Sequence, residues 1–505
     1  MSEVLKRLVV SDIDARRPAT TDTQTQVARN RLGKTDRITS ADQQFEPLPF
    51  RHGALFARRF SCVALAVCCL TLGTAAMAQE SNSKGAAQND PFDALKNIPL
   101  SSDRAVYIDF GGQFRVRSEF SDHPIFGLGT PEHNDGLLLR TFLSADLHLG
   151  PNVRAFVQLG SGLVPVWNGT PSGTQLDRLD LMQGYGELTV PASAGSVMVR
   201  AGRQEMSFGS SRLVSVRESP NIRRSFDGVR AAWIGSAGTR IDAFYTRPVV
   251  PQAGVFDDSA DPGQAFWGVY ATSHVPGVSV LKFDLYYLGL DHDNAKFARG
   301  VADEHRHTVG GRLFGKANDF DWNLEGAYQF GTFGQDNISA WTVSADLGYT
   351  VRNLPFSPRF GLNADVISGD QNLKGGTLGT FNPLFPKLPY FSEANLAAPA
   401  NLIDIQPNVT LALSKDVSLN AGWNPLWKET EADAFYGGPA VAPIKGTAGG
   451  KGRYIGQQVS TTIEWKPAKH LSFGGTFVNY TPGRRIRDAG GTSGSFAVAW
   501  ATLSF

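Results

Sequence analysis

The stretch FDWNLEGAYQF, residues 320–330, shows the pattern that decides the fold. Its residues alternate between two sides with a period of two, which is the geometry of a β-strand. One side is apolar and the other polar: Trp322, Leu324, Gly326, Tyr328 and Phe330 oppose Asp321, Asn323, Glu325 and Gln329. The stretch therefore predicts a strand with one apolar and one charged face.

The same alternation recurs along most of the chain, as in GGQFRVRSEF (111–120), NVRAFVQL (152–159) and LKFDLYY (281–287). Short and long connections between these segments also alternate, which is typical of an up-and-down arrangement. One long connection is expected at 291–304. Eighteen candidate strands, or at least sixteen, are predicted at 105–120, 137–149, 152–162, 179–190, 196–208, 226–235, 238–247, 265–274, 278–290, 305–316, 320–332, 338–350, 358–369, 402–413, 416–427, 454–465, 469–480 and 494–505.

Alternation alone also fits a soluble β-sandwich, whose polar face meets water. Three features favour a transmembrane barrel. The segments have the length of a tilted membrane span, aromatic residues recur near their ends, as in FWGVY (266–270), and the last segment closes on Phe505. Residues 105–505 are therefore predicted to form one all-β domain, a transmembrane antiparallel up-and-down β-barrel of about 18 strands with an arginine-rich lumen.

The N-terminal region has the composition of an export signal. Within 51–78, three arginines precede an apolar run, and Ala76-Met77-Ala78 resembles a cleavage site. Residues 1–50 are predicted to lie outside the fold, because of either a misassigned start or a long n-region, and 79–104 are predicted to form a flexible periplasmic leader. An exported chain of this kind is expected in the outer membrane of a Gram-negative bacterium.

Composition excludes several classes of protein. The formal net charge is only +1, so nothing indicates binding to nucleic acid. All three cysteines, Cys62, Cys68 and Cys69, lie in the predicted signal. The exported part therefore has no disulfide, thiolate metal site or cysteine nucleophile. No cofactor is expected, and no metal site, although His305 and His307 share one strand face next to acidic residues.

Arginine is concentrated at 200–230 among strand-forming residues. On the lipid face it would cost about 2–4 kcal/mol at mid-depth, so the lumen is the expected location, where guanidinium groups can contact anions bidentately. The predicted anion-contacting set is Arg115, Arg117, Arg140, Arg154, Arg200, Arg203, Arg212, Arg217, Arg223, Arg224 and Arg230. The acids expected to pair with many of them are Glu119, Asp146, Glu187, Glu205 and Asp227. Purely structural cross-lumen ladders are the alternative for any single arginine.

Several blocks resemble the alginate-export family of outer-membrane β-barrels. They are GRQEMSFGSSRLVSVRESPNIRRSFDGVR (202–230), ISGD (367–370), GTFNPLFPKLPYF (379–391), and the stretches 401–436 and 454–483. The resemblance implies an eighteen-stranded barrel that conducts a polyuronate outward. It also implies a long loop that gates or shapes one mouth, with Asp370, Phe381, Leu384, Phe385 and Pro386 as its residues.

Three function classes follow. The first is a polysaccharide exporter that works with a periplasmic scaffold and an inner-membrane synthase. The second is a passive anion-selective porin for small sugar acids or organic acids, and the distant third is an outer-membrane lipid hydrolase. No serine lies in a nucleophile-elbow pattern with a histidine, so no enzyme is expected. The chain is expected to be a monomer that contacts outer-membrane lipid and an anionic polysaccharide or small anions.

Overall fold

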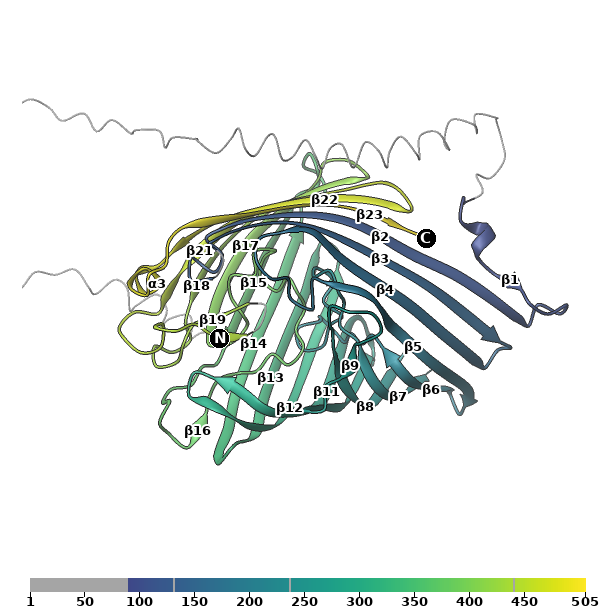
Figure 1. Cartoon of the computed structure of the whole chain (residues 1–505), viewed down its shortest axis with the longest axis horizontal. Helices are drawn as coiled ribbons and strands as arrows, with labels where there is room; N and C mark the ends of the chain where they lie inside the picture. The colour runs from purple at the N-terminus through teal and green to yellow at the C-terminus, as the bar shows by residue number, and fades with distance from the viewer. Residues whose placement is uncertain (1–89, 130–131, 236–237, 439–440) are drawn as a thin grey trace, which may run out of the picture. The chain divides into compact units, whose positions relative to one another are not determined.

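The computed structural model describes residues 90–129, 132–235, 238–438 and 441–505. Eighteen long strands form one closed antiparallel barrel, in which each pairs with its neighbours along the chain and the last, β23, pairs with the first, β2 (Figure 1). The strands are β2 (Val106–Asp122), β3 (His133–Leu149), β4 (Val153–Trp167), β5 (Asp177–Ala192), β6 (Gly195–Gln204), β7 (Phe226–Gly235), β8 (Arg240–Val250), β10 (Gln264–Val275), β11 (Val278–Phe297), β12 (Gly300–Ala317), β13 (Phe320–Phe333), β14 (Asp336–Thr350), β15 (Arg359–Ile367), β17 (Leu402–Ala412), β18 (Val417–Trp427), β21 (Tyr454–Ala468), β22 (Leu471–Pro482) and β23 (Gly494–Ser504).

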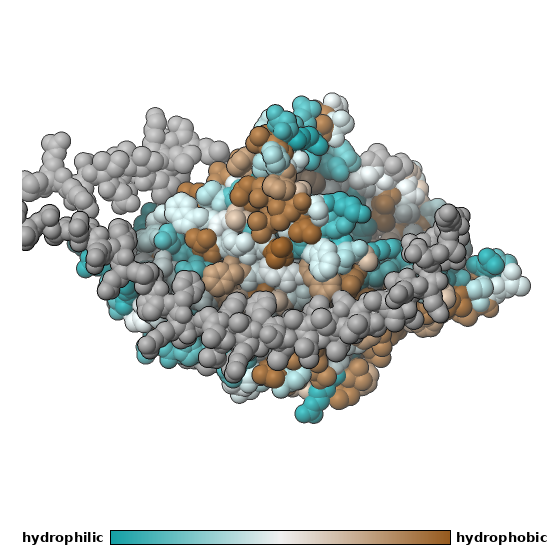
Figure 2. Space-filling model, turned by 90° about the horizontal axis from the view of Figure 1, so that it is seen from above, coloured by the Kyte–Doolittle hydropathy of each residue, from teal (hydrophilic) through white to brown (hydrophobic). Residues whose placement is uncertain are grey.

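The period of two places apolar side chains on the outside of this barrel. In β14, Trp341 and Val343 are 40 % and 55 % exposed, whereas the residues that alternate with them, Thr342 and Ser344, are buried. The exposed apolar residues recur on every second position of the neighbouring strands, as with Tyr328 in β13. Figure 2 shows hydrophobic residues in brown patches on the face of the molecule that it views. Such an outer surface suits a hydrocarbon environment.

The predicted architecture is confirmed, and all eighteen predicted segments overlap a barrel strand. The predicted long connection at 291–304 is wrong. β11 and β12 continue through most of it and join at 298–299, because the pairing Lys296↔Val301 resumes after an irregularity at His292. The strand predicted at 196–208 ends at Gln204, because the side chain of Gln183 accepts the amide of Glu205 and Met206 is buried inside the barrel.

Connections differ at the two ends of the barrel. At one end, here called the short-turn end, most are short, such as 193–194, 276–277 and 318–319; the other is the long-loop end. The described part of the expected leader, residues 90–104, contacts the short-turn end through β1 (Ile98–Pro99), which pairs with β2. The predicted extension (1–50), signal (51–78) and residues 79–89 lie outside the described residues. Within the described part of the chain, no helix is long and apolar enough to span a bilayer.

Two long loops fold inward and pack on each other. They are the β6–β7 loop (205–225) and the β15–β17 loop (368–401), which contains β16 (Thr377–Leu378). Val214 and Phe385 form a backbone bridge between them, and a buried cluster joins Phe385 to Phe226 and Phe266 of the wall. The loops thus supply apolar side chains that pack in the interior at this level of the barrel.

Candidate functional site

The candidate site is the interior surface where arginines of the wall meet the two inward loops. Arg115 of β2 and Arg140 of β3 are buried, and both donate to backbone carbonyls of the β6–β7 loop, at Glu218 and Pro220. Arg140 also pairs with the Glu218 carboxylate. These two arginines attach the β6–β7 loop to the wall, and little of either guanidinium is open to a solute.

Most of the other predicted arginines contact a carboxylate. Arg154 donates from two nitrogens to Asp146, both at 2.7 Å, and Arg200 does the same to Glu187 while it stacks 4.0 Å over Tyr185. The remaining pairs are Arg117 with Glu119 and Glu393, Arg203 with Asp227, Arg223 with Glu218 and Glu205, and Arg230 with Asp242. Each of the five predicted pairing acids lies within ion-pair distance of an arginine.

Arg212 bridges the β6–β7 loop and the opposite wall. Its Nη1 donates to Asp365 of β15 at 2.5 Å and to the Tyr390 hydroxyl at 3.1 Å. Burial opposes the charge, but the neighbouring Tyr390 and Asp365 more than offset it and raise the pKa of Arg212. Arg212 is therefore a structural cross-brace.

Three cations in the inward loops have no carboxylate partner among the described residues, and we call them the cation trio: Arg217, Arg224 and Lys387. Arg217 Nε donates only a long bond, 3.4 Å, to the Pro386 carbonyl, and the Arg224 guanidinium lies 4.9 Å from the ring centre of Phe385. Lys387 Nζ lies 5.7 Å from the ring of Tyr390. All three side chains are half-buried. Arg217 and Arg224 contact the segment 385–387, to which Lys387 belongs.

The pKa values of all three members of the cation trio are lowered, in keeping with the lack of carboxylate partners. Burial alone lowers the pKa of Arg217 to about 10, and burial together with the charge of Arg217 lowers the pKa of Arg224. Burial, and then the charge of Arg212, lowers the pKa of Lys387. A group whose charged form is destabilised in this way gains from a bound anion. Lys387 was missed in the sequence, where its only signal was a lysine in the aromatic stretch 379–391.

The predicted gate residues divide into two places. Phe381, Leu384, Phe385 and Pro386 lie in the inward part of the β15–β17 loop, where Phe381 and Phe385 are buried in the aromatic cluster. Asp370 instead lies at the start of this loop, in a polar network that joins three connections of the long-loop end.

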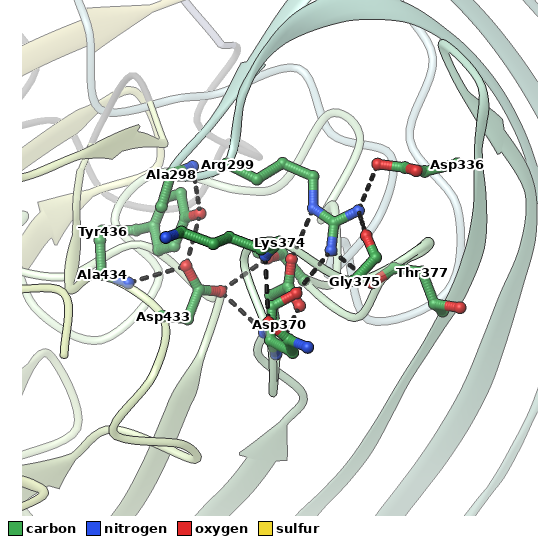
Figure 3. A network of polar contacts seen from close by, with 12 residues as sticks. Ala298, Arg299, Asp336, Asp370, Lys374, Gly375, Thr377, Asp433, Ala434 and Tyr436 are labelled. Carbon is green, nitrogen blue, oxygen red and sulfur yellow. Dashed lines mark hydrogen bonds and ion pairs between the residues drawn. The ribbon is translucent and has the colours of Figure 1, made fainter.

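Arg299, at the tip of the β11–β12 hairpin, organises that network (Figure 3). It pairs with Asp336 at 2.5 Å and with Asp370 at 2.8 Å, and donates to the carbonyls of Asn372, Gly375 and Thr377.

Asp433, from the 428–453 loop, forms the other half of the network. It accepts the Asp370 amide at 2.9 Å and the hydroxyls of Thr380 and Tyr436. The Tyr436 oxygen accepts the amide of Ala298 beside Arg299 (Figure 3).

The histidines singled out in the sequence do not form a site. Both are on β12, where His305 contacts Asp291 at 2.8 Å and His307 contacts the Tyr287 hydroxyl at 2.8 Å. Neither belongs to a group of three potential metal ligands within the described residues.

Comparison with known proteins agrees with this architecture. A protein family described as alginate export matches residues 106–499. No curated protein matches by sequence.

Among solved structures, the outer membrane protein OpdK of Pseudomonas aeruginosa is similar at 9 % identity and a TM-score of 0.52, with 79 % of this chain and 98 % of that chain covered. OpdO of the same organism gives 11 % identity and a TM-score of 0.54 over 79 % and 97 %. OccK2 (OpdF) of that organism, solved in complex with glucuronate, is similar at 10 % identity and a TM-score of 0.51, with 79 % of this chain and 98 % of that chain covered.

Proposed function

Since the chain belongs to the alginate-export family of outer-membrane channels, we propose that it conducts anionic solutes, with an acidic polysaccharide such as a polyuronate as the exported substrate. The observation that carries the proposal is the cation trio. Paired arginines such as Arg154 present little uncompensated charge, whereas Arg217, Arg224 and Lys387 have no carboxylate partner among the described residues.

The trio's position supports weak, repeated contact with a moving anion. Its members lie on two loops inside the barrel, and Arg224 and Lys387 lie beside aromatic rings. A low dielectric there strengthens the interaction of each charge with an anion. Conduction needs sites that attract an ion and still release it. A half-buried guanidinium with free donors provides such a site, and it matches the two oxygens of a carboxylate.

The experiment is single-channel recording in planar bilayers under a KCl gradient. The triple variant Arg217→Gln, Arg224→Gln, Lys387→Gln is expected to lose anion-over-cation preference by about tenfold, equivalent to about 1.4 kcal/mol. The control is Arg352→Gln at the short-turn end, where the side chain is 65 % exposed and pairs with Asp319. A triple variant with wild-type reversal potential would contradict the anion path.

A second candidate, passive uptake of small sugar acids or organic acids, is favoured by the packed interior. The aromatic cluster around Phe385 narrows the space between the two inward loops and the wall. The two candidates differ in their response to added oligouronate. The exporter is expected to show block by a polymer of several residues, whereas a porin for small acids is expected to respond only to the monomer.

The exporter proposal includes partners on the periplasmic side, a scaffold and an inner-membrane synthase that supplies the polymer. It also includes function as a monomer, because one barrel contains the complete proposed path. Light scattering of the purified protein, corrected for bound detergent, measures the oligomeric state directly.

A further inference from the structure

An acidic cluster lies at the long-loop end, between the start of β5 and the β8–β10 loop (251–263). Oxygen atoms from Asp180, Asp257 and Asp258 all lie within 4.8 Å of one another. Asp180 is buried, Asp258 is half-buried and Asp257 is exposed. The cluster is separate from the cation trio and belongs to different connections.

The backbone holds these residues together. The β8–β10 loop runs alongside β5, with a parallel bridge between Leu179 and Val255 and the amide of Phe256 donating to the Leu179 carbonyl at 2.9 Å. The Asp180 carboxylate then accepts the amides of Asp257 at 2.8 Å and Asp258 at 3.1 Å. The acids are therefore positioned by main-chain bonds and not by chance proximity of mobile side chains.

A fourth carboxylate, that of Asp177, is buried near this group but lies outside the set of oxygens within 4.8 Å of one another. It lies three residues before Asp180 on β5 and is 0 % exposed, and neither of its oxygens makes a hydrogen bond of normal geometry within the described residues. Asp258, Asp180 and Asp257 lie near enough for their charges to act on Asp177, and the Leu179 amide is within its reach. Buried carboxylates of this kind are normally paired or bound to a metal ion.

Basic side chains do not neutralise the cluster. Arg203 is the one arginine in its contacts among the described residues, at 3.6 Å from Asp180, and its shorter bonds go to Asp227 at 2.8 and 3.0 Å. The one guanidinium near the cluster is thus already paired with Asp227.

We propose that Asp177, Asp180, Asp257 and Asp258 form a binding site for a divalent cation, with Ca²⁺ as the preferred ion. Ca²⁺ takes six to eight oxygen ligands, including monodentate carboxylates and backbone carbonyls, in flexible geometry. Four carboxylates on two connections match this chemistry, and the exposed Asp257 gives the ion access from solvent. The bound ion ties the β8–β10 loop to the wall at β5. This site does not depend on the identity of the transported solute.

The test is calorimetric titration of the detergent-solubilised, EDTA-treated protein with CaCl₂, and with MgCl₂ in parallel. Saturable Ca²⁺ binding is expected with a Kd of about 10⁻⁴–10⁻³ M, the range of extracellular calcium modules. Mg²⁺ is expected to bind more weakly, because it keeps its water and demands regular octahedral geometry. Ca²⁺ should also raise the unfolding temperature, because it binds only the folded state.

Two variants locate the site. Asp257→Asn changes an exposed side chain, and Asp177→Asn changes the buried one; each is expected to weaken Ca²⁺ binding by roughly 10- to 100-fold. The control Asp488→Asn makes the same change at an exposed acid of the 483–493 loop and should leave binding unaltered. Absence of saturable binding in the wild type, or wild-type affinity in Asp257→Asn, would overturn the proposal even if Asp177→Asn does not fold.

Discussion

Arg200 and Arg217 show at the residue scale how neighbours decide what an arginine does. Arg200 gives two bonds to Glu187 across the β5–β6 hairpin and stacks on Tyr185. Arg217 has a left-handed backbone (φ 56°), and within the described part of the chain its side chain donates only to the Pro386 carbonyl. The first holds the wall together, and the second has no carboxylate partner within the described residues. Arg115 and Arg140, predicted to contact anions, instead bind loop carbonyls.

Lys428 provides a prediction at the same scale. Its side chain is fully buried just beyond β18, and Nζ donates to the carbonyls of Glu431, Asp433 and Thr447 at 2.8–3.0 Å. Burial lowers its pKa to about 8. Lys428→Met removes all three donors and leaves the carbonyls unpaired. This is expected to lower the stability of the 428–453 loop by about 1–3 kcal/mol. Amides of the 428–453 loop, such as Phe435, should exchange about 5- to 150-fold faster in hydrogen-exchange mass spectrometry.

The matched control for this variant is Lys451→Met, an exposed lysine of the same loop. It should leave the exchange rates unaltered. Equal exchange in Lys428→Met and in the wild type would show that the three carbonyls find other partners.

At the element scale, the loops of the long-loop end divide into those that enter the barrel and those that hold them. The β6–β7 and β15–β17 loops enter and pack on each other. The β11–β12 hairpin and the 428–453 loop hold the base of the β15–β17 loop through Arg299 and Asp433. The position of the inward loop thus depends on charged contacts at its base, which can break without loss of the barrel.

Arg299 is the residue to change at this scale. Arg299→Gln removes both ion pairs and most of the donors to the β15–β17 loop, so this loop should become more mobile. Single-channel current is then expected to fluctuate between more levels, with faster hydrogen exchange at 370–380. The control is Arg484→Gln, because that side chain is 90 % exposed and its acid lies 3.9 Å away. Unaltered current noise and exchange in Arg299→Gln would mean that Asp433 alone holds the loop.

At the scale of the whole molecule, the pairing between the first and the last strand closes the barrel. β23 pairs with β2 over Gln113↔Ser504 to Asp122↔Ser495, and Phe505 continues the ladder through two bonds with Gly112. The Phe505 ring stacks on Phe92 with 4.8 Å between centroids. The segment 90–104 therefore reinforces the seam at which the first and last strands meet.

Phe505→Ala tests this seam. It keeps the backbone bonds but removes the ring contacts with Phe92 and Phe114. The free energy of unfolding is expected to fall by about 1–3 kcal/mol, because two aromatic pairs are lost. The temperature at which the folded, compact band disappears in gel electrophoresis should fall. Phe320→Ala, which removes a 41 % exposed ring from the short-turn end of β13, serves as the control, and an equal effect of both variants would argue against a special role for the seam.

The sequence alone predicted the strands because side-chain alternation is a local property of extended backbone. It also predicted that Asp146 and Glu187 pair with arginines, and in the structure their partners, Arg154 and Arg200, lie on strands that are neighbours in the chain. The family resemblance implied a long loop with Asp370 and Phe381 but gave no direction for it.

Only the tertiary structure decided which cations remain unpaired and which acids gather without a base. Arg212 meets Asp365, and Arg117 meets Glu393, across separations of 153 and 276 residues. The cation trio and the cluster around Asp177 likewise join segments from separate connections. Spacing in the chain carries no information on such meetings, because they depend on how a closed barrel folds its loops inward and along its rim.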